Sequence, residues 1–551
     1  MSEGVSELER ARAGYVPRLP VILQSGIAAL EVEEGAATGA VRDAEAIRGH
    51  FPRTFGRPVV RFIRGSGARE SRALRVGVVL SGGQAPGGHN VITGLFDALA
   101  QAHGDSKLFG FLGGPRGIFD ERVEELTAER VGPYRNTGGF DLLGSGRDKI
   151  ETDRQLADCR AACEKLALDG LVVVGGDDSN TNAAVLAEYF LKHGLPLSVV
   201  GVPKTIDGDL KGEQVEISFG FDTATKLYSE LIGNICRDAK SAGKYWHFIK
   251  LMGRSASHVT LECALQTRAN IALIGEEIEA RGQTLQQVVD QIVEVIRRRT
   301  ASGRHHGVCL VAEGLIEFIP EMRALIAELN RIVSAEDAAI DALGSQAEKA
   351  ALLGQRLSPA GAQVFASLSD KIRRQLLLDR DSHGNVQVSK IDTEQLLIDG
   401  VKQRLERGSF QGRFQVQPHF LGYEGRCAAP SNFDADYTYS LGRLAAALIA
   451  FGKTGYICCV GNLVQDPQRW EALGVPLTSM MQLDQRKGKP TPVIGKALVQ
   501  LDGAPFRKFA ESREAWATDD RYRYPGPIQY FGPSDVSGRA TRTLLLERGG
   551  A

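Results

Sequence analysis

The sequence lacks the features that would assign its 551 residues to a class of protein at once. It has no apolar run long enough to cross a bilayer, and its first twenty residues contain no apolar core of a signal peptide. It also lacks a surplus of charge of one sign, because it contains 66 basic and 67 acidic residues. This composition gives no reason to expect a nucleic-acid or membrane partner, and it favours a cytoplasmic protein.

The chain has few cysteines, and their spacing does not match that of metal ligands. The eight cysteines form no CxxC pair and have no histidine at the spacing typical of a zinc site. Cys159 and Cys163 stand one helical turn apart, but two small side chains packed on a helix explain that spacing better than a disulfide does. We therefore expect reduced, mostly buried thiols.

A repeated order of apolar strand, polar loop and helix fills much of the chain instead. Residues 75–80, RVGVVL, run into a glycine-rich loop and then into a helical pattern at 91–103. The unit recurs at 168–194, where LDGLVVV leads through GGDDSNT into a second helical pattern. Further strands are expected at 195–202, 244–251, 269–275 and 305–314. Apolar strands that alternate with helices predict parallel sheets covered on both faces.

Breaks in this order predict where domains begin and end. Residues 1–74 are expected to be an N-terminal extension with helix-like pieces, and residues 75–240 a first α/β domain. Residues 241–470 are expected to form a second α/β domain that contains a charged helical insert at about 318–410. Residues 471–551 are expected to be a closing C-terminal segment. In such sheets ligands bind beyond the carboxyl ends of the strands, so the loops after the strands form the candidate site.

The first of these loops is SGGQAPGGHN. Gly82 and Gly83 allow backbone amides to converge on an anion at a helix start, although the same residues also suit a tight turn without a ligand. The loop matches neither a P-loop nor the dinucleotide fingerprint, because the Lys-Ser/Thr pair and the glycine spacing of those motifs are missing. It is a weak signal by itself.

The second loop, GGDDSNT, contains Asp177 and Asp178 at a strand end, where an unpaired buried carboxylate would be costly. A divalent hard cation such as Mg²⁺ that bridges a carboxylate and phosphate oxygens would explain one of them. A helix N-cap is the alternative for Asp178 or the following serine, but it does not account for both acids.

The third loop, PKTIDGD, contains Lys204, Thr205, Asp207 and Asp209 within six positions. A lysine places a point charge on phosphate, and a nearby aspartate is suited to accept a proton from a hydroxyl that attacks this phosphate. A polar surface turn has a similar composition. Three consecutive strand ends with amides, acids and a lysine nevertheless favour phosphoryl transfer to an alcohol.

Other loops supply charges that suit a sugar phosphate. Arg254 and Arg426 offer paired donors for a phosphate, and Glu313 offers a carboxylate for hydroxyl groups. Each of the three alone is more often a surface charge. Arg147 and Lys149, in LLGSGRDKI, form another basic loop that could face the transferred group.

Taken in order, these motifs have a family likeness. SGGQAPGGHN, TGGFDLLGSGRDKI, GGDDSNTNAA, PKTIDGD, KYWHFIKLMGRSASH, AEGLIEF and GYEGRCAAPSNFDADYTYSLG resemble the phosphofructokinases in their long pyrophosphate-dependent form. The similarity runs from about Arg75 to Leu441, and the later YPGPIQYFG is also similar to that form. It implies two Rossmann-like three-layer αβα domains with parallel-rich sheets. It also implies Mg²⁺-dependent, reversible transfer of phosphate from pyrophosphate to the C1 hydroxyl of fructose 6-phosphate.

The resemblance implies roles for single residues. Gly83, Arg147 and Lys149 would bind pyrophosphate, Asp177 would hold Mg²⁺, and Asp207 would be the catalytic base, with Lys204 and Asp178 also catalytic. The residues expected at the sugar phosphate are Thr205, Ile206, Asp207, Met252, Gly253, Arg254, Glu313, Tyr423, Glu424, Gly425 and Arg426. Lys244 and Tyr245 are similar to a pair that reaches the neighbouring subunit's site, which implies a homodimer or a higher homo-oligomer with shared active sites.

Three positions depart from the ATP-using branch of the family. That branch has glycine where this chain has Asp178 and Lys204, and commonly histidine where it has Tyr423. A carboxylate at 178 would repel the α-phosphate of a nucleotide, since two unit charges ~4 Å apart at an effective dielectric of ~20 cost about 4 kcal/mol. We therefore expect pyrophosphate as the donor. An ATP-dependent phosphofructokinase that tolerates Asp178 and a non-catalytic regulatory subunit of the same fold are the alternatives.

Overall fold

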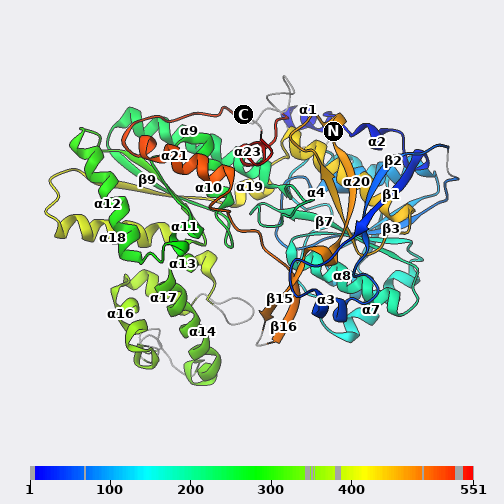
Figure 1. Ribbon diagram of the computed structural model, residues 1–551, viewed down its shortest axis with the longest axis horizontal. Helices are drawn as coiled ribbons and strands as arrows, with labels where there is room; N and C mark the ends of the chain where they lie inside the picture. The colour runs from blue at the N-terminus through cyan, green and yellow to red at the C-terminus, as the bar shows by residue number, and fades with distance from the viewer. Residues whose placement is uncertain are drawn as a thin grey trace. The chain divides into compact units, whose positions relative to one another are not determined.

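A computed structural model describes residues 7–67, 70–341, 348, 352, 354–378, 386–486, 489–527 and 538–549 (Figure 1). The chain divides into two compact units, each with a sheet of its own. Unit 1 comprises the described residues within Met1–Ala224, Tyr423–Ala497 and Ile528–Ala551. Unit 2 comprises those within Thr225–Gly422 and Leu498–Pro527.

The sheet of unit 1 has ten strands in the order β1-β2-β14-β13-β7-β6-β3-β4-β5, with the short β8 beside β7. The pairs from β13 to β4 are parallel, and those toward the two edges are antiparallel. The strands are β1 (Leu30–Ala37), β2 (Pro58–Arg64), β3 (Arg75–Leu80), β4 (Lys107–Phe111), β5 (Val123–Leu126), β6 (Gly170–Gly175), β7 (Ser198–Thr205), β8 (Phe219–Gly220), β13 (Tyr456–Gly461) and β14 (Glu471–Pro476).

Helices cover both faces of this sheet. The helices of unit 1 are α1 (Glu7–Ala13), α2 (Val21–Gln24), α3 (Ala44–His50), α4 (Gly88–Ala102), α5 (Arg116–Phe119), α6 (Ala128–Val131), α7 (Asp153–Lys165), α8 (Asp177–Lys192), α19 (Tyr423–Cys427), α20 (Asn432–Ala450) and α23 (Arg542–Glu547). Val173 of β6 belongs to the apolar cluster under α7 and α8. Its neighbours Val172 and Val174 are equally buried on the opposite face, which α4 and α20 cover. Unit 1 is therefore a three-layer αβα structure.

Glycine permits the close packing of α4 on α20. A Cβ at Gly94 would lie 2.2 Å from the oxygen of Tyr439, and a Cβ at Gly442 would lie 2.1 Å from the oxygen of Val91. Any side chain at either position would separate the two helices. A hairpin of β15 (Met481–Arg486) and β16 (Lys489–Ile494) completes unit 1 and packs on α8.

The sheet of unit 2 has four parallel strands in the order β10-β11-β9-β12. They are β9 (Tyr245–Leu251), β10 (Ile271–Leu273), β11 (Gly307–Ala312) and β12 (Gln415–Leu421). The helices are α9 (Phe221–Ala242), which begins in unit 1, α10 (His258–Thr267), α11 (Gly275–Ala280), α12 (Leu285–Ala301), α13 (Leu315–Phe318), α14 (Pro320–Asp341), α16 (Pro359–Ser367), α17 (Asp370–Leu378), α18 (Thr393–Arg407) and α21 (Ala504–Thr518). Trp246 and Phe248 pack against Val288, Ile292 and Ile296, whose spacing of four residues forms one face of α12.

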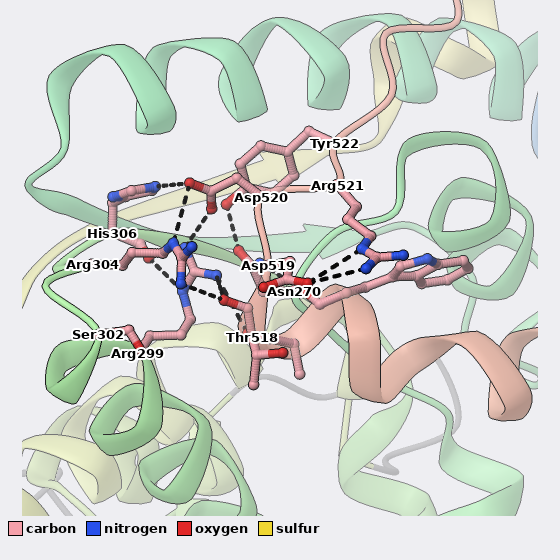
Figure 2. A network of polar contacts seen from close by, with 12 residues as sticks. Asn270, Arg299, Ser302, Arg304, His306, Thr518, Asp519, Asp520, Arg521 and Tyr522 are labelled. Atoms are coloured by element: carbon pink, nitrogen blue, oxygen red, sulfur yellow. Dashed lines mark hydrogen bonds and ion pairs between the residues drawn. The ribbon is translucent and has the colours of Figure 1, made fainter.

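A buried polar network fastens the segment after α21 to unit 2 (Figure 2). Arg299 of α12 is fully buried and donates to Oδ1 of Asp520 at 2.7 Å and to the backbone oxygen of His306 at 2.9 Å. Nε2 of His306 lies 3.2 Å from Oδ2 of Asp520. A buried guanidinium requires such partners, because an unpaired charge in a protein interior is costly. The network explains why residues 498–527 belong to unit 2.

The strands predicted from sequence are present. Those expected at 75–80, 168–174, 195–202, 244–251, 269–275 and 305–314 correspond to β3, β6, β7, β9, β10 and β11 within a few residues. The described part of the expected insert contains α14, α16, α17 and α18. The prediction for the N-terminal extension was incomplete, because β1 and β2 were not expected. The sequence of β1, LEVEEGAA, alternates apolar and polar residues only over its first four positions, and its three glutamates are exposed, as suits an edge strand.

The compact units divide the chain at other positions than the expected domains. Residues 423–470, assigned from sequence to the second domain, lie in unit 1 because α20 packs on α4 and β13 pairs with β7 and β14. Of the motif YPGPIQYFG, residues 528–532 lie outside the described residues. All eight cysteines are free, as expected, and seven are buried. Among the described residues, no helix is both long and apolar enough to cross a membrane.

Candidate functional site

The carboxyl ends of β3, β6 and β7 lie next to one another in unit 1. The parallel register pairs Leu80 with Val174 and Gly175 with Pro203, so the loops after the three strands begin at one edge of the sheet. This edge gathers the glycine loop, the loop with two aspartates and the PKTIDGD loop. Open α/β sheets bind their ligands at such an edge.

The glycine loop is shaped by its backbone and by its neighbours. Gly82 has a φ of +83°, which residues with side chains rarely adopt, and its amide donates to the oxygen of Gly146 at 2.8 Å. A Cβ at Gly83 would lie 2.5 Å from Nη2 of Arg426, so a side chain there would have to displace this guanidinium. The backbone conformation therefore favours glycine at 82, whereas the neighbouring arginine favours it at 83.

Lys204, near the end of β7, reaches the glycine loop. Its Nζ donates to the oxygen of Gly83 at 2.7 Å, and its side chain is buried. Burial and then the charge of Arg426 lower the pKa of Lys204 to about 8, although three nearby aspartates oppose the shift. An ammonium beside a glycine turn is suited to bind phosphate oxygens.

Asp178 is paired with two cations. Its Oδ2 lies 3.3 Å from Nζ of Lys149, and its Oδ1 accepts a hydrogen bond of 2.8 Å from Nη1 of Arg486. Burial favours a raised pKa for this carboxyl, but the two cations outweigh burial and hold the pKa below its usual value. Because the carboxylate carries its own counter-charges, we expect it to repel a nucleotide phosphate by less than about 4 kcal/mol.

Asp177 and Asp209 share a third cation. Nζ of Lys496 lies 3.9 Å from Oδ2 of Asp177 and 4.0 Å from Oδ2 of Asp209. Burial and the charge of Asp207 raise the pKa of Asp209 to about 7, although Lys496 opposes them. A partly neutral Asp209 lessens the repulsion among the aspartates of this edge.

Asp177 is the residue best suited to a metal ion. It lies in the first turn of α8, and its side chain is 25% exposed. Within the described part of the chain, no three His, Cys, Asp or Glu side chains gather around a possible metal position. Mg²⁺ in phosphate-binding proteins commonly takes one or two carboxylates together with substrate phosphates and water. The residues present therefore fit Mg²⁺ that binds together with a phosphate ligand.

Asp207 lies in the turn after β7. Its amide donates to Oγ1 of Thr205 at 3.0 Å, and its side chain is half-buried. Its carboxylate makes no hydrogen bond or ion pair to the rest of the described chain. Ile206 is 2% exposed and anchors the turn. An unengaged carboxylate in an anchored turn is suited to accept a proton from a substrate hydroxyl.

In unit 2 the carboxyl ends of β9, β11 and β12 form a similar edge. The amide of Gly253 donates to Oε2 of the buried Glu313 at 3.0 Å, and the amide of Met252 donates to the oxygen of Leu421 at 3.0 Å. These bonds hold Met252, Gly253 and Glu313 together. Arg254, the next residue, is exposed.

Helix α19 carries the remaining residues expected at a sugar phosphate. Tyr423 is 67% exposed, Glu424 is exposed, and Gly425 is buried. Arg426 lies against Gly83, with its Cζ 5.9 Å from the centroid of the Tyr423 ring. The structure therefore places Arg426 at the glycine loop of unit 1.

Two expected residues, Lys244 and Tyr245, lie away from the edge of unit 2 that Met252 follows. Lys244 and Tyr245 stand at the start of β9, with Nζ of Lys244 5.0 Å from the centroid of the Tyr245 ring, whereas Met252 follows its end. Eight residues of extended chain span on the order of 25 Å, so the pair does not join the Met252 edge of its own unit. Arg147 has an exposed side chain, but it directly follows Gly146, whose oxygen accepts a hydrogen bond from the amide of Gly82. Its backbone therefore lies next to the glycine loop.

Sequence reasoning missed Arg486 and Lys496. Arg486 ends β15 and is 308 residues away from Asp178 in the chain, and Lys496 follows β16. No strand-loop-helix pattern or known motif marks either residue. The only signal was the basic stretch QRKGK at 485–489, which alone predicts a solvated turn.

A parallel sheet whose strand ends gather a glycine turn, a buried lysine and several aspartates is typical of phosphate-binding α/β proteins. The family described as phosphofructokinase matches residues 75–449, and the chain belongs to this family. The fold expected from the resemblance, with parallel-rich α/β sheets, is thereby confirmed.

Individual relatives match over nearly the whole chain. The pyrophosphate--fructose 6-phosphate 1-phosphotransferase of Treponema pallidum is 53% identical over 99% of this chain and 97% of its own. The protein of that name from Porphyromonas gingivalis is 53% identical over 98% of this chain and 99% of its own. The crystal structure of a pyrophosphate-dependent phosphofructokinase from Marinobacter aquaeolei has a TM-score of 0.53 at 15% identity, covering 82% of this chain and 93% of that one. This last likeness concerns the fold alone.

Proposed function

We propose that the chain transfers a phosphoryl group from pyrophosphate to the C1 hydroxyl of fructose 6-phosphate, giving fructose 1,6-bisphosphate and phosphate. The observation that carries this proposal is the buried Lys204, which donates to Gly83 in the same loop cluster that presents Asp207. The names of relatives that are 53% identical over nearly the full chain support it. The reaction is readily reversible, because the phosphoryl groups of donor and product are closer in free energy than with ATP.

The residues of unit 1 supply the chemistry. Asp207 accepts the proton of the C1 hydroxyl while the bond from this oxygen to phosphorus forms and a bond of pyrophosphate breaks. Lys204 stabilises negative charge on the donor phosphate oxygens. Gly83 allows the backbone to approach the donor, and Lys149 and Arg147 add positive charge. Asp177 would hold Mg²⁺, which supplies charge neutralisation for the donor oxygens when it is bound.

The choice of donor depends on Asp178 and Lys204. Asp178 occupies the position at which the ATP-using branch of the family has glycine, so we assign it the exclusion of nucleotides. The charge of Asp178 is offset by Lys149 and Arg486, so charge repulsion makes only a smaller contribution to the exclusion of nucleotides. The exclusion depends mainly on the space that the Asp178 side chain fills and on the two cations that it binds. Pyrophosphate is short enough to avoid it.

We assign the sugar phosphate to the residues expected for it from the sequence, which are Thr205, Ile206, Asp207, Met252, Gly253, Arg254, Glu313, Tyr423, Glu424, Gly425 and Arg426. Lys244 and Tyr245 are proposed to serve the site of a neighbouring subunit in a homodimer or higher homo-oligomer. Eight free thiols suit a reducing compartment such as the cytoplasm.

The test is the donor dependence of turnover. The purified chain should release phosphate from pyrophosphate only in the presence of fructose 6-phosphate and Mg²⁺, and faster than it transfers phosphate from ATP. Asp207→Ser should lower kcat by about 10²- to 10⁴-fold with little change in fructose 6-phosphate affinity, because only the base is lost. Faster turnover with ATP would identify an ATP-dependent enzyme. Binding of fructose 6-phosphate without any turnover would identify a regulatory subunit.

A further inference from the structure

Lys496 has no part in the reaction as proposed, although it reaches the same edge of unit 1. Its Nζ lies 3.9 Å from Oδ2 of Asp177 and 4.0 Å from Oδ2 of Asp209. These distances suit an ion pair and exceed that of a direct hydrogen bond. The ammonium therefore faces two carboxylates at once, and one of them belongs to the residue best suited to a metal ion.

The backbone on either side of this lysine is bound to the loops that carry the two acids. The amide of Ile494 donates to Oγ1 of Thr181 at 3.1 Å, and this hydroxyl donates to the backbone oxygen of Asp177 at 2.9 Å. The amide of Ala497 donates to the backbone oxygen of Asp209 at 2.8 Å. The fold therefore sets the position of the lysine between the acids.

The lysine is more exposed than its partners. The side chain of Lys496 is 40% exposed, whereas those of Asp177 and Asp209 are 25% and 10% exposed. A lysine has a flexible four-carbon stem, and its ammonium has three donors that rotate. The ammonium can therefore turn toward a ligand at this edge while the loops keep the acids in place.

A metal ion on Asp177 would conflict with the ammonium in this position. Mg²⁺ binds carboxylate oxygens at about 2.1 Å, so an ion on Oδ2 of Asp177 would lie within about 6 Å of Nζ of Lys496. Two positive charges at such a separation repel each other. The metal and the ammonium therefore compete for one carboxylate.

We propose that Lys496 competes with Mg²⁺ for Asp177 in the free protein, and that it turns to the phosphate oxygens of the donor when metal and donor bind together. This inference rests on the proposed function, in which Asp177 would hold Mg²⁺. A donor phosphate offers the displaced ammonium new acceptors, whereas the metal alone offers none. The free protein therefore binds the metal weakly, and metal and donor strengthen each other's binding. The ammonium stays protonated throughout.

The metal is tested first without the donor. Mn²⁺, which prefers the same oxygen ligands as Mg²⁺, is titrated into the wild-type chain and into Lys496→Gln, and unbound Mn²⁺ is measured by electron paramagnetic resonance at one pH and ionic strength. We expect Lys496→Gln to bind Mn²⁺ about tenfold more tightly, because a competing but partly exposed charge is lost. A lysine that only supported the fold would give the opposite sign, since its loss would loosen the acids.

Lys489→Gln is the matched control. It removes the same charge from an exposed position of β16, and it should leave the Mn²⁺ affinity unchanged. Asp177→Asn should abolish the gain, so that adding Lys496→Gln to this variant does not strengthen Mn²⁺ binding. Thermal unfolding of each variant checks that the fold is kept.

The donor is tested second, together with its metal. Magnesium imidodiphosphate, which is not turned over, is titrated calorimetrically into the same variants. We expect Lys496→Gln to bind this complex no more tightly than the wild-type chain does, and up to about tenfold more weakly. The variant is relieved of the competition but lacks the charged hydrogen bond from the ammonium to phosphate.

The outcomes distinguish this inference from the function beneath it. Unchanged or weaker Mn²⁺ binding in Lys496→Gln would overturn the inference, as would an equal gain in Lys489→Gln or in the Asp177→Asn background. An equal gain for Mn²⁺ and for magnesium imidodiphosphate would also overturn it, because the ammonium would then stay on the aspartates in the bound state. These results would leave the proposed phosphoryl transfer standing. A wild-type chain that binds no magnesium imidodiphosphate would contradict the proposed function itself.

Discussion

At the scale of single residues, Lys204 combines burial with a charge that the proposed reaction needs. Its pKa is lowered to about 8, so the free protein carries the ammonium at pH 7 and loses it as the pH rises through 8. The ammonium pairs with phosphate oxygens and the neutral amine does not. We therefore expect the affinity for magnesium imidodiphosphate to fall above pH 8. The decrease should approach about tenfold for each further pH unit.

Lys204→Arg separates this effect from the titration of the ligand. Arginine stays protonated throughout, so the pH dependence of the variant reports the ligand's ionisation and not that of residue 204. The ratio of wild-type to variant affinity, measured by calorimetry between about pH 7 and 9.5, should fall with an inflection near 8. A constant ratio over this range would mean that Lys204 does not lose its proton there.

Sequence reasoning worked at this scale where a motif directly follows an apolar strand. Asp177, Lys204 and Asp207 could be predicted to share one edge, because parallel strands end together. The counter-charges of the aspartates could not be predicted. Arg486 is 308 residues from Asp178, and no periodic pattern links two residues that meet only through the tertiary fold.

At the scale of elements, the β15–β16 hairpin sets the charge around the donor loop. Arg486 supplies one of the two cations on Asp178, and its loss leaves Lys149 as the remaining partner. We expect Arg486→Gln to weaken ATP binding further and to raise the KM for pyrophosphate, because the carboxylate is then less neutralised. The effect should be about tenfold or smaller, since both groups are partly exposed.

Asp178→Gly should have the opposite effect and strengthen the binding of ATP. Removing the carboxylate frees space and leaves Lys149 and Arg486 for a nucleotide phosphate, so the inhibition constant of ATP should fall. Lys489→Gln, on an exposed position of the same hairpin, is the control and should leave both constants unchanged. If Arg486→Gln and Asp178→Gly shift ATP binding in the same direction, the account of Asp178 is wrong.

The elements that sequence reasoning recognised are those buried on both faces. In β3, β6 and β7 nearly every residue is buried, and each strand contains a run of valines or leucines, which is the pattern of central parallel strands. β1 is an edge strand whose glutamates face solvent, so its pattern is close to that of a polar loop. Strand prediction from apolar runs therefore found the centre of the sheet and missed its edge.

At the scale of the whole molecule, the discontinuous units were beyond prediction. The chain returns to unit 1 at residues 423–497, and the apolar run of β13, YICCVG, would suit a central strand in either sheet. Which sheet it joins depends on the packing of α20 on α4, where Gly94 and Gly442 permit a close approach. Such pairing of distant helices leaves no signal within one segment of sequence.

The proposed sharing of sites between subunits also belongs to this scale. Lys244 precedes β9 and Met252 follows it, so within unit 2 the two are separated by on the order of 25 Å of extended strand. If Lys244 serves the partner's site, Lys244→Ala and Asp207→Ser are each inactive as homodimers. A mixed dimer then has one site with both residues intact and one site that lacks both.

We therefore expect activity to return when the two inactive variants are dissociated, mixed in equal amounts and reassembled. Half of the dimers are mixed and half of their sites are complete, so the recovered kcat should approach about a quarter of the wild-type value. A mixture of Asp207→Ser with Asp207→Asn should recover nothing, because every site then lacks the base. Mixed dimers that form but remain as inactive as the two parent variants would contradict this proposal. Lys244 would then act in the site of its own chain or in no active site, and the subunits would not share their sites through it.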